Sequence, residues 1–425
     1  MSFAATARDG ILGTLRAPDL RREALNYGKL MSGTLGRMGL QALYFFVLAN
    51  ALSLAELGLF ASAAAVGLML ASFSGLGFGG LAFRAAAGRP RLLGRYLGAY
   101  FAGLCLTLPL GLALALPVWL ALFQAAMPLT AFAAILLVEM GIWRSLEVLA
   151  QAQTGLGRYG ASSLILTLGA SIRAAGAVLL AMTGGGLDAW VAIYFVTNLL
   201  ALAVVWYFLR PAARLRLRLR LLRARLRDGL MFAVSYFALN AQGQVDKVIV
   251  LSLADARLAG IYAIASRLVD FTALPLRSFY ALYTRKLIGE GRRIRNAVRR
   301  ILTMEAVILA ISTLGFLVVV GLLSQWPLLL GHNIATALPL LALMLAVPAF
   351  RNLLEFHGEL YFVGGRMTAR AVVAVGLAVL GSGALALLLW STQDIIRVGL
   401  WLNAIYAGLY GLSALALFKF VTGRT

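Results

Sequence analysis

The chain contains 425 residues, of which 62% are hydrophobic and only 13% are charged, and its mean hydropathy is +0.90. Soluble domains are roughly 45–50% apolar and about 25% charged, so the composition predicts an integral membrane protein. The net charge of +22 would suit a nucleic-acid partner only on the basic face of a soluble domain. No soluble stretch of domain size occurs, so no nucleic acid is expected.

Cysteine and histidine are scarce, which excludes the common metal centres. Cys105 is the single cysteine and lies in an apolar run, and the two histidines are His332 and His357. The sequence therefore predicts no disulfide framework, no metal site and no cofactor. It also offers no P-loop, zinc motif or catalytic triad, so an enzyme is not expected.

Residues 1–26 mix arginines with acids and lack the order of a signal peptide, so we expect a cytoplasmic lead-in to the first span. Twelve apolar segments follow, each near the 20 residues with which a helix crosses a bilayer. They cover residues 29–52, 57–83, 96–122, 128–152, 160–182, 189–209, 229–254, 258–284, 301–323, 335–360, 367–390 and 396–418. The predicted fold class is an all-α polytopic membrane protein.

The connections between these segments alternate in charge. Residues 84–95, 210–227 and 285–300 hold four, eight and seven Lys or Arg, whereas residues 123–127, 183–188 and 324–333 hold none. Basic loops stay on the cytoplasmic side of a membrane, so the pattern places them and both termini in the cytoplasm.

The basic run 210–227 divides the chain into an N-terminal lobe, residues 1–209, and a C-terminal lobe, residues 228–425, with six spans each. Lobes with an even number of spans enter the membrane the same way round, so any repeat is parallel. Leu57-Gly58-Leu59-Phe60-Ala61 in the first lobe matches Ala259-Gly260-Ile261-Tyr262-Ala263 in the second. We expect the run itself to lie on the anionic lipids of the inner leaflet.

Polar residues form matching stripes on the first span of each lobe. They are Arg37, Gln41 and Tyr44 in the first, and Asn240, Gln244 and Lys247 in the second, all offset by 203 residues. The i, i+4, i+7 spacing places each set on one helical face. Hydrogen bonding between helices would explain them, but polar stripes in spans mostly face interiors, and we favour the lining of a central cationic cavity.

Arginines also lie in the middle of apolar segments, where one costs about 2.5–3.5 kcal/mol on insertion scales. Some have an acid one helical turn away, and the expected pairs are Arg144–Glu147, Arg267–Asp270 and Arg351–Glu355. We interpret Arg144 as structural, while Arg267 and Arg351 could serve structure or substrate. Arg173 has no acid within a turn, so its partner must come from another helix, water or an anionic ligand.

Short motifs distributed along the chain resemble a known family. They are Gly28-Lys29-Leu30, Glu56-Leu57-Gly58-Leu59-Phe60, and Asp246-Lys247 followed by residues 259–268. With these motifs and its layout, the chain resembles the Wzx-type O-antigen and exopolysaccharide flippases of the multidrug/oligosaccharidyl-lipid/polysaccharide exporter superfamily. The lipid II flippases of that superfamily typically have two further spans, which this chain lacks.

The resemblance implies two six-helix lobes around a V-shaped cavity in the bacterial inner membrane. It implies that an undecaprenyl-pyrophosphate-linked oligosaccharide crosses from the cytoplasmic to the periplasmic leaflet, with polysaccharide assembly proteins as further partners. Arginine pairs bidentately with phosphate oxygens, which suits that cargo. The predicted substrate-binding residues are Arg37, Gln41, Arg173, Asn240, Gln244, Lys247, Arg267 and Arg351.

Two alternatives stay open. A drug exporter of the same superfamily would want acids in its cavity for cationic substrates, whereas the first span carries an arginine and no acid. A membrane polysaccharide polymerase would normally expose a sizeable loop with acids or histidines for acid–base chemistry. The loops here are short and rich in arginine, which favours a transporter.

Overall fold

The computed structural model describes residues 36–209, 213–289, 297–363 and 367–422. Within these ranges the chain forms helices and short turns and no strand. Each of the twelve expected spans coincides with a helix or with a short series of helices, so the predicted all-α fold is confirmed. The motif at residues 28–30 and the start of the first span lie outside the described residues.

The N-lobe begins with a helix over residues 36–51. Its other elements are α3 (Leu54–Leu70), η1 (Ala71–Gly77), α4 (Phe78–Gly88), η2 (Pro90–Leu92), α5 (Leu93–Leu122), α6 (Leu129–Leu137), η3 (Val138–Trp143), α7 (Arg144–Gly155), α8 (Tyr159–Thr183), α9 (Leu187–Val204) and η4 (Val205–Leu209). Helix α3 begins with a capping box, in which the Ser53 and Glu56 side chains bond to each other's backbone N–H groups.

The C-lobe follows the basic run. Its helices are α10 (Leu219–Leu253), α11 (Ala256–Gly289), α12 (Ala297–Gln325), α13 (His332–Leu343), α14 (Val347–Val363), α15 (Met367–Ser391) and α16 (Ile395–Thr422). Helix α10 starts ten residues before the expected span, because the second half of the basic run is helical.

Eight helices of the described residues are long and apolar enough to cross a membrane, and the pair α13 and α14 would add a ninth. That pair is bent by 74° at its break. Asn403 satisfies backbone groups there, since its amide donates to the Leu343 oxygen at 2.6 Å and accepts from the Ala346 nitrogen at 2.9 Å. A buried break in a span needs such partners, because lipid supplies none.

The second expected span, residues 57–83, is also broken. Between α3 and α4, Gly75, Leu76 and Gly77 all adopt positive φ angles, and Leu76 is the only non-glycine residue that does so among the described residues. A Cβ on Gly77 would overlap the carbonyl oxygen of Gly229 in α10. The break therefore lets α10 approach the N-lobe backbone closely.

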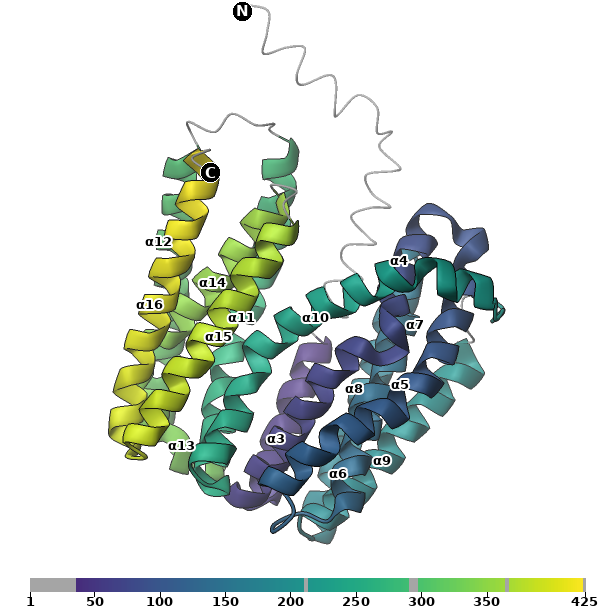
Figure 1. The fold of residues 1–425 in the computed structure, drawn as a ribbon. Helices are drawn as coiled ribbons and strands as arrows, with labels where there is room; N and C mark the ends of the chain where they lie inside the picture. The colour runs from purple at the N-terminus through teal and green to yellow at the C-terminus, as the bar shows by residue number, and fades with distance from the viewer. Residues whose placement is uncertain (1–35, 210–212, 290–296, 364–366, 423–425) are drawn as a thin grey trace, which may run out of the picture.

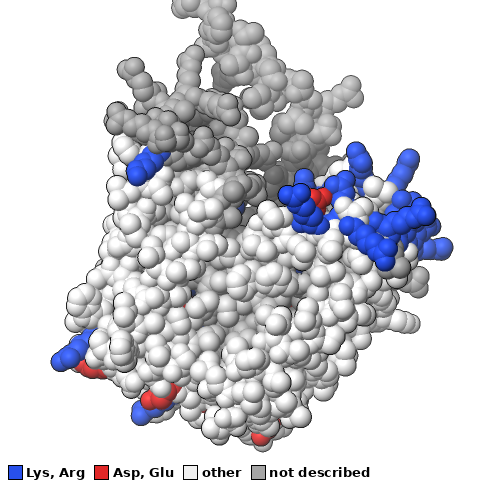
Figure 2. Space-filling view, viewed as in Figure 1, with Lys and Arg blue, Asp and Glu red and all other residues white. Residues whose placement is uncertain are grey.

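The two lobes converge at one end and splay apart toward the end that carries the C-terminus (Figure 1). Helix α10 runs from the N-lobe into the C-lobe, where it packs against α15, and along the way it contacts α3 and η1. Helices α3 and α11 make the most extensive contact between the lobes. Exposed Lys and Arg side chains gather over the N-lobe where α10 begins (Figure 2).

The repeated glycine motif lies at the converged end. A Cβ on Gly58 would overlap the carbonyl oxygen of Ala256, and a Cβ on Gly260 would overlap that of Leu54. Only glycine allows two backbones to come this close. The equivalent glycines of the two repeats thus pack against each other's helices, and one apolar core continues from Leu57 to Ile261 across the contact.

Side-chain amides link the lobes at the same end. Asn333 donates to the carbonyl oxygens of Ala49 and Leu52, both at 2.7 Å. Asn50 donates to the carbonyl oxygen of Leu330 at 2.7 Å. These bonds satisfy backbone carbonyls at the end of helix 36–51 and join it to the segment that leads into α13.

Candidate functional site

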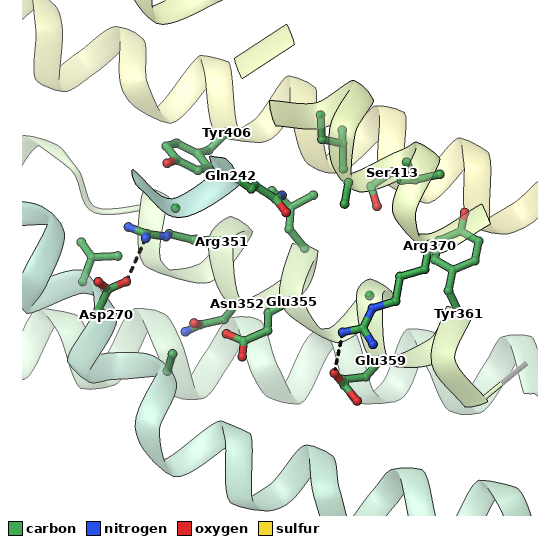
Figure 3. A pocket seen from close by; sticks show the side chains of 18 residues that line it. Gln242, Asp270, Arg351, Asn352, Glu355, Glu359, Tyr361, Arg370, Tyr406 and Ser413 are labelled. Atoms are coloured by element: carbon green, nitrogen blue, oxygen red, sulfur yellow. Dashed lines mark hydrogen bonds and ion pairs between the residues drawn. The ribbon is translucent and has the colours of Figure 1, made fainter. Parts of the chain in front are cut away.

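A cavity of about 290 Å³ lies inside the C-lobe between α10, α11, α14, α15 and α16 (Figure 3). Its polar walls are Gln242, Asp270, Arg351, Asn352, Glu355, Glu359, Tyr361, Arg370, Tyr406 and Ser413. The pocket is therefore lined by charges of both signs, namely two guanidinium groups and three carboxylates.

Two ion pairs cross this cavity. Arg351 on α14 contacts Asp270 on α11 at 2.9 Å, and Arg370 on α15 contacts Glu359 at 3.0 Å. Buried charges are costly unless paired, so the pairs hold three helices around the pocket. A guanidinium has five N–H donors, so Arg351 could also bind a ligand while it is paired with Asp270.

The expected pairs within single helices are therefore only partly right. Arg144 and Glu147 do pair, at 2.8 Å. The predictions for Arg267 with Asp270 and for Arg351 with Glu355 are wrong, since Asp270 pairs with Arg351 instead. The spacing of a sequence identifies neighbours on one helix, whereas this carboxylate faces a guanidinium from another helix.

Arg173 lies inside the N-lobe, where it has several partners. Its Nε and Nη2 donate to Asn198 Oδ1 at 3.2 and 2.7 Å. Its guanidinium carbon lies 3.9 Å from the centre of the Trp143 ring and 4.9 Å from that of Tyr194. Tyr194 in turn donates to the buried Glu139. The partner that the sequence left open is thus an aromatic and amide shell on neighbouring helices.

Arg173→Gln should destabilise the N-lobe by about 3 kcal/mol, because it removes a desolvated cation–π contact and leaves Asn198 without its charged donor. Thermal unfolding of the detergent-purified protein measures the loss. Arg158→Gln, which changes an exposed arginine just before α8, is the matched control. Equal midpoints for the two variants would contradict a structural role for Arg173.

The three residues of the polar stripe on α10 hydrogen-bond in two different ways. Asn240 donates to Ser72 of η1 at 3.0 Å, so it bonds helix to helix. Lys247 Nζ donates to Gln244 Oε1 at 2.7 Å, which makes these two predicted residues partners of each other. Next to them, Asp246 accepts from Tyr262 at 2.8 Å.

Arg267 occupies a different position, beside the contact between the lobes. Its guanidinium carbon lies 5.6 Å from the ring centre of Phe271 and 6.0 Å from that of Phe45 on helix 36–51. Its Nε is buried and has no hydrogen-bond partner among the described residues. Arg37 and Gln41 lie on the same helix as Phe45, and both are partly buried.

Of the eight predicted residues, Arg351 alone lines the C-lobe cavity, while the others lie in the N-lobe, on α10 and beside the lobe contact. Sequence reasoning missed Arg370, Glu359 and Tyr406 as lining residues. Arg370 stands near the start of a span, where a basic residue usually signals topology. Its partner on α14 gave no signal in the sequence.

A second buried polar cluster lies next to the cavity. His357 is 1% exposed, and its ring nitrogens lie 2.8 Å from Glu305 Oε1 and 2.8 Å from Ser413 Oγ. Tyr410 donates to the other oxygen of Glu305 at 2.9 Å and stacks on the histidine ring. The cluster ties α12, α14 and α16 together.

His357→Ala should lower stability by about 2–3 kcal/mol, because Glu305 and Ser413 would each lose a buried hydrogen bond. Thermal unfolding in detergent checks this. His332→Ala changes the other histidine, which is exposed, and should leave the midpoint nearly unchanged. A His357→Ala protein as stable as the His332→Ala protein would refute the structural assignment.

Comparisons with known proteins agree with this architecture. A family model described as polysaccharide biosynthesis protein matches residues 25–280, more than half of the chain. No curated protein matches the sequence significantly.

Solved structures of low sequence identity share the fold. An inward-facing multidrug resistance MATE family transporter of the MOP superfamily has a TM-score of 0.69 at 15% identity, over 92% of this chain and 98% of its own. The lipid II flippase MurJ in an inward closed conformation has a TM-score of 0.62 at 11% identity, over 93% and 87%. An outward-facing MATE family transporter has a TM-score of 0.57 at 15% identity, over 94% and 96%.

The family match covers most of the N-lobe, helix α10 and most of helix α11, and the fold comparisons cover both lobes. The chain therefore belongs to the polysaccharide biosynthesis protein family, and it shares its fold with MATE family transporters and with the lipid II flippase MurJ.

Proposed function

We propose that this transporter moves an undecaprenyl-pyrophosphate-linked oligosaccharide from the cytoplasmic to the periplasmic leaflet by alternating access. The observation that supports this most concerns Arg267, in a chain of the polysaccharide biosynthesis family. Its guanidinium lies beside the lobe contact, and its Nε has no hydrogen-bond partner among the described residues. A guanidinium held inside a bundle of spans needs an anion or water. Pyrophosphate oxygens match its planar fork of donors.

The C-lobe cavity suits the hydroxyl-rich part of the same cargo. Its carboxylates and the side chains of Asn352 and Tyr406 accept or donate hydrogen bonds to hydroxyl groups. Its volume of about 290 Å³ lies near the lower end of the usual range for ligand pockets, about 300–1,000 Å³. We assign it to one sugar unit, not to the whole lipid-linked molecule.

We further propose that residues 1–209 and 228–425 act as the two moving lobes, joined by residues 210–227 in the bacterial inner membrane. The positive-inside pattern supports a cytoplasmic location for both termini and for the splayed end. In this state the periplasmic end is closed by Gly58, Gly260 and Asn333. The greater similarity to the inward-facing than to the outward-facing MATE family transporter also supports a state that is open toward the cytoplasm.

Arg351 offers a direct test of the cavity. Arg351→Gln should reduce surface polysaccharide export, because it removes a charged donor and leaves Asp270 unpaired. Export should fall about thirtyfold if one charge-assisted bond of about 2 kcal/mol is lost. The measurement is surface polysaccharide in cells that carry the variant as their only copy, with protein abundance checked in membranes.

The double variant Arg351→Gln/Asp270→Asn separates binding from charge balance. It removes both members of the pair, so folding should recover while export should stay low. Recovered export in the double variant would show that Arg351 only neutralises Asp270, and would remove the cavity from the proposed mechanism.

One observation favours a second candidate, the export of a cationic drug. Asp270, Glu355 and Glu359 all line the cavity, and carboxylates there could attract a cation. Overexpression would then confer resistance to cationic dyes, and Asp270→Asn would abolish it. Unchanged dye sensitivity on overexpression would eliminate this candidate.

A further inference from the structure

Three arginines surround a small cavity on the N-lobe, far from the C-lobe pocket. They are Arg95 on α5, Arg218 immediately before α10, and Arg220 in the first turn of α10. The cavity measures about 280 Å³, and its other walls are Leu92, Tyr96 and Leu221. No acidic residue is among the six that line it.

The backbone that brings these arginines together is held in place. Residues 213–218 run without helical structure beside the start of α5, and the Arg216 nitrogen donates to the carbonyl oxygen of Gly94 at 2.9 Å. A Cβ on Gly98 would lie 2.6 Å from the Arg216 oxygen, so glycine is needed for this approach. The segment that leads to Arg218 is thus held against α5 at Gly94 and Gly98.

Within the part of the chain that the structure describes, no acidic side chain pairs with these three positive charges. The nearby Arg225 is already paired with Asp228 at 2.8 Å. Helix α10 begins beside them, which adds the positive end of a helix dipole to the same region. Like charges around one cavity repel one another unless an anion lies between them.

Apolar side chains stand exposed on the extended segment and at the end of the preceding span. Leu217 is 58% exposed on the extended segment, and Tyr207 and Phe208 at the end of the preceding span are 75% and 72% exposed. Aromatic residues at the end of a span are typical of the membrane interface. A cationic cavity beside exposed apolar residues suits an amphiphile better than a free anion.

We propose that this cavity binds the phosphate or pyrophosphate headgroup of an anionic membrane lipid, with the lipid chain against the exposed apolar residues. The headgroup could belong to a phospholipid of the bilayer or to a polyprenyl pyrophosphate. The chemistry is the same for both, and the inference does not depend on the proposed function.

The test compares two double variants of equal charge on the same stretch of chain. Arg218→Gln/Arg220→Gln removes cavity residues, whereas Arg223→Gln/Arg227→Gln removes exposed arginines that do not line the cavity. The full-length protein in detergent is titrated with phosphatidylglycerol and with phosphatidylcholine, and bound lipid is counted by native mass spectrometry. All four arginines are exposed, so both proteins should fold.

We expect phosphatidylglycerol affinity to fall by about fivefold for each cavity arginine removed, and to change much less in the control double variant. Arg95→Gln should reproduce the loss from the α5 side. Equal losses in the two double variants would overturn the proposal, because they would show general attraction by a basic surface.

A second titration with undecaprenyl pyrophosphate identifies the source of the headgroup. Preference for this lipid over phosphatidylglycerol, lost in Arg218→Gln/Arg220→Gln, assigns the cavity to capture of a polyprenyl pyrophosphate. Equal binding of the two lipids assigns it to a bilayer phospholipid. Binding of neither lipid by the unmodified protein would also overturn the proposal.

Discussion

Gly58→Ala should abolish transport, because the added methyl group would overlap the carbonyl oxygen of Ala256 where the two lobes meet. Overpacking typically costs about 1–3 kcal/mol. The cost should be at the upper end here, because the clashing atom belongs to the backbone and cannot rotate away as a side chain could. If the substitution destabilises the state in which the lobes meet at Gly58 by about 3 kcal/mol, the equilibrium shifts more than a hundredfold toward the state in which they are apart at this end. The lobes should separate here and approach each other at the splayed end.

The shift can be measured as a distance between spin labels on the two lobes at the splayed end. Residues 158 and 302 are exposed in the two lobes, and Cys105→Ser removes the single native cysteine. The distance should shorten in Gly58→Ala. Gly408→Ala, where a Cβ would meet nothing within 4 Å, should leave distance and transport unchanged. A Gly58→Ala protein that transports normally would show that the glycine contact has no part in closure.

Arg267→Gln should reduce lipid-linked oligosaccharide transport by about thirtyfold with little change in stability. Its buried Nε has no hydrogen-bond partner in the described structure, so the protein gains little by keeping the charge there. Loss of one charge-assisted bond to a pyrophosphate would remove about 2 kcal/mol of binding. Arg267→Lys should recover part of the activity, since it keeps the charge but not the fork of donors.

Arg144→Gln is the informative contrast. Arg144 is 5% exposed, pairs with Glu147 at 2.8 Å, and lies 4.5 Å from the Tyr236 ring centre. Its loss should lower stability, whereas loss of Arg267 should lower transport. If Arg267→Gln unfolds at lower temperature and the surviving folded protein transports normally, Arg267 is structural and the proposed pyrophosphate contact is wrong.

The sequence was sufficient for the fold because hydropathy and loop charge both follow from the bilayer. Each of the twelve apolar segments is helical over most of its described residues, and the motif around Gly58 and Gly260 identified equivalent positions in the two lobes. The contact between those glycines was not foreseen, since a local match cannot show which surfaces meet. Likewise, the break at Leu76 needs positive φ angles that the hydropathy pattern does not reveal.

The ion pairs of the candidate site were harder to predict than the fold, because they join side chains on different helices. Asp270 pairs with Arg351, although the acid one turn away on α14 is Glu355. Arg173, which has no acid nearby in sequence, is satisfied by Asn198 and by the Trp143 ring. The i, i+3 and i, i+4 rules describe a single helix, whereas the bundle decides which of several neighbours a buried guanidinium meets.

The charge of the proposed cargo determines the expected effect of the membrane potential on transport. A potential negative inside favours outward movement of an anion by about 2.3 kcal/mol per charge per 100 mV. Export of a pyrophosphate-linked lipid could therefore be driven electrically. A cationic drug would be held back by the same potential, so the sign of the effect separates the two candidate functions.

The most direct test reconstitutes the purified protein in liposomes that contain an undecaprenyl-pyrophosphate-linked oligosaccharide and follows the arrival of the sugar at the opposite leaflet. We predict translocation that speeds up when the potential is negative on the side of departure, slows when it is reversed, and falls about thirtyfold in Arg267→Gln. Translocation no faster than in protein-free liposomes, at either sign of the potential, would contradict the account.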